Sequence, residues 1–177
     1  RDRLNILENE IHLHEESHIA IGHTRWATHG PKNNINAHPH HDNSNMFSIV
    51  HNGIIETFAT LKNELIQENY IFHSNTDTEV IAVLLGKYYK VTENIEEAIQ
   101  KTVQRLQGTW ALVIIHKDFP EQIWLTRNGS PLLLGIEENF VLIVSEQIAF
   151  NNSIKSFIII ENHDIIHVKK TNNKIEY

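Results

Sequence analysis

Apolar residues follow two different periods along the chain, and the period changes near its middle. In the first half, apolar residues three or four positions apart predict amphipathic helices over residues 57–69 and 76–89. At the start of the second of these, Thr76 precedes the apolar run and Glu79 follows three residues later, which is the pattern of an N-terminal capping box. The same spacing predicts a third helix over residues 93–107.

We expect Gly108 to end this third helix, and beyond it short β-branched runs alternate with turn residues. These runs predict six strands, at residues 109–116, 122–127, 131–136, 140–145, 156–160 and 164–169. Alternating patterns predict two earlier strands at 18–25 and 46–52, and Gly, Pro and Asn residues predict a loop over 30–45. The sequence Arg-Asn-Gly-Ser at 127–130 indicates a hairpin turn. Strands, then helices, then many strands favour an α+β domain with an antiparallel meander.

Composition narrows the class of protein. The chain has 177 residues, of which 41% are hydrophobic, and this is enough for one domain with a sizeable core. A net charge of −7 argues against binding to nucleic acid. The sequence shows no apolar run long enough to cross a membrane and no secretory leader, so we expect a cytoplasmic location. Its lack of cysteine excludes disulfides, thiolate metal sites and a thiol nucleophile within these residues.

Two histidine-rich stretches raise the question of a metal. The sequence HEESH at 14–18 matches a zinc-protease pattern that needs both histidines on one helical face. Here the second histidine begins an alternating run, so surface polar residues are the preferred interpretation. The sequence AHPHH at 37–41 is histidine-rich but has no obvious carboxylate partners, which favours a loop that positions one histidine beside a pocket. We therefore expect no metal and no cofactor.

Three other stretches carry groups suited to amino-acid chemistry. Arg25, in IGHTRWATHG at 21–30, lies at the end of a predicted strand. It is suited to clamping a carboxylate, and core packing explains it equally well. Asn52 and Gly53 form either a tight turn or an oxyanion hole made of a side-chain amide and a backbone N–H. Asp77 either caps a helix or binds an ammonium group. Together these groups would recognise a free amino acid and support acyl transfer at its side chain.

The stretches HTRWATHG, NAHPH, HNGIIE and TDTEVIA resemble, in this order, the glutaminase domains of the glutamine–fructose-6-phosphate aminotransferase family, which are class II glutamine amidotransferases. The resemblance runs from about Gly22 to the end of the chain. It implies the N-terminal-nucleophile fold, an αββα sandwich of mostly antiparallel sheets. The related amidophosphoribosyltransferase domains favour Tyr-Ser where this chain has Trp26 and Ala27, and Gln-Pro where it has His38 and Pro39.

The resemblance implies L-glutamine as the substrate and gives each motif residue a role. Arg25 would bind the α-carboxylate and Asp77 the α-ammonium group. Asn52 and Gly53 would form the oxyanion hole, and His38 would lie in a loop near the site, with its own role open, as are those of the neighbouring His40 and His41. Three more residues would shape the pocket around Arg25: Trp26, Thr28 and His29.

The sequence also departs from this family. The family nucleophile is an N-terminal cysteine whose α-amino group serves as the base, and an Arg-Gly-Tyr-Asp loop also contacts glutamine; neither occurs here. We therefore expect residues 1–177 to be a partial glutaminase domain, incomplete at its N-terminus and inactive alone. The isomerase domain that takes fructose 6-phosphate is expected to be absent, and the full protein to be a homo-oligomer. Two alternatives stay open: an amidophosphoribosyltransferase glutaminase domain, and a non-catalytic module that binds an amino acid.

Overall fold

The computed structural model describes residues 17–25, 30–172 and 174–177. In this part of the chain the strands form two antiparallel sheets. The larger sheet consists of β1 (His40–His41), β2 (Phe47–Ile55), β3 (Gly108–His116), β4 (Gln122–Asn128), β8 (Ile165–Thr171) and β9 (Lys174–Glu176), paired in that order. The smaller sheet consists of β5 (Leu133–Ile136), β6 (Val141–Val144) and β7 (Phe157–Ile159), with β5 in the middle.

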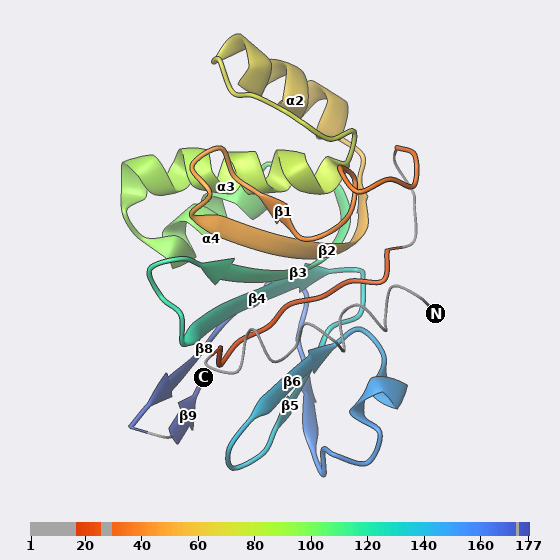
Figure 1. The fold of residues 1–177 in the computed structure, drawn as a ribbon, viewed down its shortest axis with the longest axis vertical. Helices are drawn as coiled ribbons and strands as arrows, with labels where there is room; N and C mark the ends of the chain where they lie inside the picture. The colour runs from red at the N-terminus through yellow and green to blue at the C-terminus, as the bar shows by residue number, and fades with distance from the viewer. Residues whose placement is uncertain (1–16, 26–29, 173) are drawn as a thin grey trace.

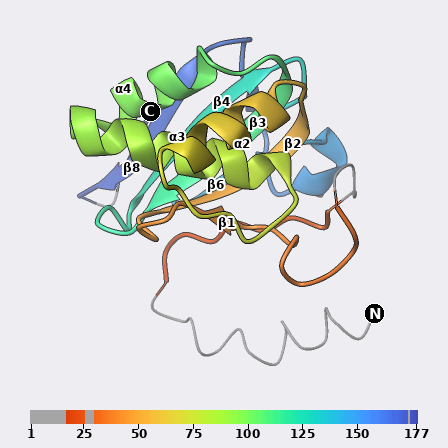
Figure 2. The same ribbon diagram turned by 90° about the horizontal axis from the view of Figure 1, so that it is seen from above.

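The described elements form three layers. Three helices, α2 (Phe58–Gln67), α3 (Asp77–Thr92) and α4 (Ile95–Val103), lie together on one side of the larger sheet, and the smaller sheet lies on the other side (Figure 1). Seen from above, α2 and α3 lie over β2, β3 and β4 (Figure 2). A short 3₁₀ helix, Gln147–Phe150, follows β6. No helix in the described ranges is both long enough and apolar enough to span a bilayer.

The period-two pattern of β3 explains how one strand serves two cores. Trp110, Leu112 and Ile114 belong to the core between the larger sheet and the helices. Ala111 and Val113, which point to the opposite face, belong to the core between the two sheets. A strand buried on both faces therefore reads as a continuous apolar run, as the sequence of β3 does.

The expected helices and the six strands predicted after Gly108 are confirmed, with small shifts at their ends. The third helix ends earlier than predicted, at Val103. Gly108 does not end it; this residue begins β3, with a φ of +114°. Two strands, β1 and β9, were not predicted, and β1 lies inside the loop that was expected over residues 30–45. The strand predicted at 46–52 extends to Ile55.

Two of the expectations about strands are wrong. Residues 18–25 form no regular strand, although Ile19 and Ile21 are half-buried against the core between the sheets. The pattern alternates because the core covers one face of this segment, although the segment pairs with no strand in the described residues. Residues 127–130 do not form a hairpin, because β4 pairs with β3 and β8 whereas β5 pairs with β6 and β7. The turn at Gly129 instead carries the chain from one sheet to the other, so the strands form two sheets and no single meander.

Candidate functional site

The start of α3 is held by a dense set of hydrogen bonds. The hydroxyl of Thr76, the N-cap residue, accepts the backbone N–H of Glu79 at 3.3 Å, as a capping box predicts. The carboxylate of Glu79 does not reach back to Thr76; it accepts the backbone N–H groups of His73 and Ser74 at 2.8 and 2.7 Å. These contacts fix the turn that precedes α3 and thereby the position of Asp77, the first helical residue.

Asp77 joins α3 to the end of β2. Its side chain is buried, and its Oδ2 atom accepts the backbone N–H of Ile55 at 2.9 Å. Its Oδ1 atom lies 3.5 Å from the hydroxyl of Thr78 and 4.0 Å from Nδ1 of His51. A carboxylate at a helix N-terminus is favoured by the helix dipole. Asp77 therefore has a structural role in this chain, beside the role in ammonium binding that remains a prediction.

Asn52 and Gly53 lie inside β2, opposite Ala111 and Trp110 of β3, so the tight-turn interpretation of this pair is wrong. Gly53 has a φ of +137°, and a Cβ atom at this position would lie 2.1 Å from the carbonyl oxygen of Thr109. Only glycine fits such a conformation at such a close approach. The backbone at Gly53 is thus distorted beside Asn52, and the oxyanion hole at this pair stays a prediction.

Arg25 is the last residue described before the segment that contains three of the predicted site residues. Its backbone has a φ of +54°, and its N–H donates to Nδ1 of His23 at 2.9 Å. Its guanidinium donates to the carbonyl oxygens of Pro31 and Gly30, at 3.0 and 3.3 Å. Two of its five N–H donors therefore brace the following loop. The predicted pocket residues Trp26, Thr28 and His29 lie outside the described residues.

A row of histidines connects Arg25 to Asn52. The Nε2 atom of His23 lies 2.5 Å from Oδ1 of Asn52, and the ring of His23 lies against that of His38, with a centroid distance of 4.2 Å. The ring of His40 follows, 5.0 Å from that of His38. Burial, together with the nearby rings and Arg25, lowers the pKa of His38 to about 3. His38 is therefore a neutral ring next to the Asn52–His23 pair.

The structure thus brings together four of the predicted residues from separate segments. Arg25 and His38 come from the loops before β2, and Asn52 from β2 itself; Asp77 comes from α3. Sequence reasoning missed two groups that connect them, namely His23 and the hydroxyl of Thr78. A signal for His23 was present, because in an alternating run it shares a face with Arg25 two residues later.

The described residues give no support to a metal centre. None of their His, Asp and Glu side chains form a group of three or more that is placed to hold a metal ion. Of the stretch HEESH, residues 14–16 lie outside the described ranges. In AHPHH, the Nε2 atoms of His38 and His40 form hydrogen bonds with the hydroxyls of Thr78 and Thr76, both at 3.1 Å.

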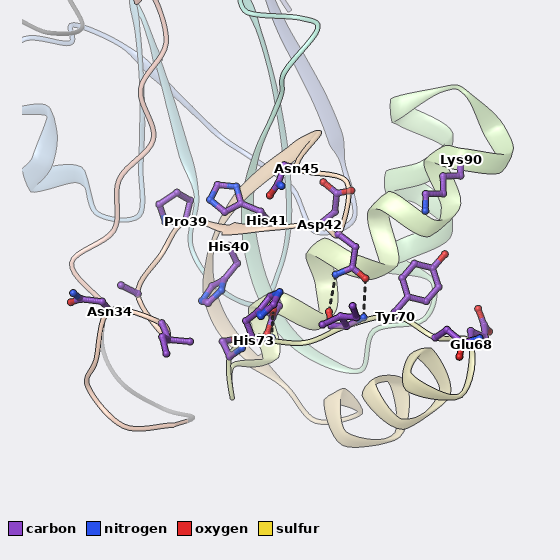
Figure 3. A pocket seen from close by; sticks show the side chains of 17 residues that line it. Asn34, Pro39, His40, His41, Asp42, Asn45, Glu68, Tyr70, His73 and Lys90 are labelled. Carbon is purple, nitrogen blue, oxygen red and sulfur yellow. Dashed lines mark hydrogen bonds between the residues drawn. The ribbon is translucent and has the colours of Figure 1, made fainter.

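A separate pocket of about 800 Å³ lies beside this cluster, between the loop before β2 and the segment that leads into α3 (Figure 3). His40, Tyr70 and Lys90 are among the residues that line it. The side-chain amide of Asn43 closes one wall through hydrogen bonds of 2.7 and 3.0 Å to the backbone of Ile71. Of the predicted glutamine-site residues that the structure describes, none lines this pocket, whereas His40 both lines it and lies against the ring of His38.

Comparison with known families gives the class of protein to which the chain belongs. Residues 8–174 match the glutamine amidotransferase domain family, and the chain belongs to it. More particularly, the chain is 49% identical over 138 residues to the glutamine–fructose-6-phosphate aminotransferase (isomerizing) of Thermococcus kodakarensis, covering 78% of this chain and 23% of that protein. It is 40% identical over 168 residues to the enzyme of the same name from Leifsonia xyli, covering 94% and 27%. The chain thus spans about a quarter of the length of these curated relatives.

Solved structures agree on the fold. The glutamine phosphoribosylpyrophosphate amidotransferase of B. subtilis superposes with a TM-score of 0.70 at 21% identity, over 87% of this chain and 33% of that one. A structure described as the allosteric regulatory enzyme of purine biosynthesis gives a TM-score of 0.71 at 22% identity, with the same coverage. The fold is therefore that of the N-terminal-nucleophile amidotransferases, as the resemblance implies. The amidophosphoribosyltransferase alternative is supported only by these distant structural neighbours.

Proposed function

We propose that this chain is the glutamine-binding part of an enzyme that transfers the amide nitrogen of L-glutamine to fructose 6-phosphate and forms glucosamine 6-phosphate. The names of the relatives that share 40–49% identity with it support this choice of acceptor. The observations that carry the proposal are the contacts of Asn52 and of the Arg25 backbone with His23, and the position of Asp77, whose carboxylate lies 4.0 Å from His51. The cytoplasmic location and the homo-oligomeric state of the full protein stay predictions.

Each of these groups suits one part of glutamine. The planar fork of Arg25 matches the α-carboxylate, and the carboxylate of Asp77 matches the α-ammonium group. The side-chain amide of Asn52 and the backbone N–H of Gly53 would stabilise the oxyanion that forms when a thiolate attacks the side-chain carboxamide. The attack forms a bond between sulfur and carbon; when the tetrahedral intermediate collapses, its nitrogen takes a proton and leaves as ammonia. Water then cleaves the thioester and releases glutamate.

The second candidate function is an amino-acid-binding module without catalysis. It rests on one fact: these 177 residues contain no cysteine, whereas the predicted chemistry needs a thiolate. Both candidates require glutamine to bind at the same residues, so binding and ammonia release must be measured separately.

The test is calorimetric titration of the folded chain with L-glutamine, with L-glutamate as the competing ligand. We expect glutamine to bind, and Asp77→Asn to weaken this binding at least tenfold, because an amide cannot neutralise an ammonium group. Asp118→Asn, a change of the same chemistry on the exposed surface, should leave it unchanged. A folded chain that shows no heat with millimolar glutamine would contradict the proposal. We also expect the chain alone to release no ammonia, and measurable release would refute that expectation.

A further inference from the structure

The hydroxyl of Thr78 lies between two histidine rings from different parts of the chain. Its Oγ1 atom is 3.1 Å from Nε2 of His38 and 3.1 Å from Nδ1 of His51. Thr78 is only 1% exposed, so water does not compete for this hydroxyl. Its third neighbour, Oδ1 of Asp77, lies at 3.5 Å, the longest of the three distances.

The direction of these hydrogen bonds follows from the contact that His51 makes through its other ring nitrogen. The Nε2 atom of His51 lies 3.4 Å from the carbonyl oxygen of Thr109, and a carbonyl oxygen can only accept. Nε2 of His51 therefore carries a proton. When the ring of His51 is neutral, its Nδ1 is a lone-pair acceptor, and the single proton of the Thr78 hydroxyl is donated to it.

The same logic then applies to His38. Because the hydroxyl proton of Thr78 points to His51, its oxygen accepts, and the donor is an N–H at Nε2 of His38. The lowered pKa of His38 means that this ring carries one proton at neutral pH. Its other nitrogen, Nδ1, is then a bare lone pair. It is buried and has no hydrogen-bond partner among the residues that the structure describes.

We infer that Thr78 is a positioning residue, whose hydroxyl sets the tautomers of His38 and His51 and leaves Nδ1 of His38 as an unpaired acceptor in the ring that lies against His23. A buried acceptor without a partner costs free energy in the folded protein. A ligand that donates an N–H group to this nitrogen would remove that cost. An amino acid with its ammonium and carboxamide groups is such a ligand. This last step rests on the proposed function, whereas the assignment of the tautomers does not.

The test uses the chain labelled with ¹⁵N in its histidines, since the ring ¹⁵N shifts distinguish the protonated from the unprotonated nitrogen. In the wild-type chain we expect His38 and His51 both to be protonated at Nε2. Thr78→Val removes the hydroxyl at nearly constant volume and should leave His38 as a mixture of both tautomers, whereas Thr78→Ser should restore the wild-type spectrum. Thr126→Val is the matched control, because this buried hydroxyl has no hydrogen-bond partner in the described part of the chain.

A wild-type His38 protonated at Nδ1 would overturn the inference, as would a Thr78→Val spectrum with unchanged histidine tautomers. If Thr78→Val does not fold, the wild-type spectrum still tests the inference, because a proton at Nδ1 of His38 overturns it. Glutamine titration separates this inference from the proposed function. We expect Thr78→Val to weaken glutamine binding roughly tenfold, the equivalent of one hydrogen bond. If the tautomers are as expected but the wild-type chain binds no glutamine, the proposed function fails and the role of Thr78 stands.

Discussion

The Nε2 atom of His23 lies 2.5 Å from the side-chain oxygen of Asn52, and the other ring nitrogen of His23 accepts the backbone N–H of Arg25. The acceptor role of one ring nitrogen determines where the proton of the ring lies. Because Nδ1 accepts, Nε2 carries the proton and donates to the amide oxygen of Asn52. The NH₂ group of Asn52 therefore points away from His23. Arg25 thus contributes through its backbone to the orientation of the amide that is predicted to hold the oxyanion.

This relationship predicts graded losses of rate in a glutaminase-active form of the protein that carries the cysteine nucleophile. Asn52→Ala should lower kcat by roughly 10²–10³-fold with a smaller effect on KM, because an oxyanion donor acts mainly in the transition state. His23→Phe should cause a smaller loss, since the amide remains but is no longer oriented. Ammonia release measures both. The exposed Asn34→Ala is the control, and an effect of Asn52→Ala on KM alone would count against an oxyanion hole.

A second prediction concerns stability at Gly53. Alanine there combines an unfavourable positive φ with a Cβ atom 2.1 Å from a backbone oxygen, so β2 and β3 must separate locally. We expect Gly53→Ala to destabilise the chain by about 2–4 kcal/mol, which at this chain length lowers Tm by roughly 4–16 °C. Gly22→Ala is the matched control, because a Cβ atom there would meet nothing within 4 Å. Thermal unfolding followed by circular dichroism gives both values, and equal Tm values for the two variants would refute the argument.

A third prediction separates the shape of the Arg25 side chain from its charge. Arg25→Lys keeps the charge but cannot hold the two loop carbonyls and a carboxylate with a planar fork. We expect glutamine binding to weaken at least tenfold, measured by calorimetry, with little change in Tm. Arg105→Lys alters a surface ion pair with Glu64 in the same chemical way and should have no effect. Unchanged glutamine affinity in Arg25→Lys would remove Arg25 from the predicted site.

The sequence predicted most helices and strands because their local signals agree with their tertiary environment. The Thr76 cap precedes an apolar stripe, and the stripe is buried. The prediction of a strand at 18–25 failed because period-two alternation indicates only that one face of a segment is buried. It does not show that the segment has a hydrogen-bonded neighbour. The hairpin predicted at 127–130 failed for a related reason: Asn-Gly specifies a turn, but the pairing of the strands on either side depends on the two sheets.

The candidate site was predicted unevenly. Arg25, Asn52 and Asp77 were recognisable because each has a residue type suited to its expected role. Thr78 was not, because its significance comes from two rings that are 40 and 27 positions away in sequence. The turn interpretation of Asn52 and Gly53 was wrong because the positive φ of Gly53 serves a close approach between strands.

The last prediction concerns the dependence of stability on pH. Burial lowers the pKa of both His38 and His40 below the usual 6.5, in His38 to about 3. Below pH 6.5 the unfolded chain therefore binds protons that the folded chain does not, so the free energy of unfolding falls as the pH drops from 6.5 toward 3.

Urea unfolding midpoints at pH 7.5, 6.5, 5.5 and 5.0 should show this fall above the range where most carboxylates titrate. Burial also lowers the pKa of His116 and His167, and these groups contribute to the same fall. His38→Gln removes one of the contributing groups, so its midpoint should fall less steeply over the same interval, whatever its stability at pH 7.5. The exposed His73→Gln should keep the wild-type slope. Parallel curves for His38→Gln and the wild-type chain would show that His38 takes up its proton equally in both states, and so would contradict a buried neutral ring in the folded chain.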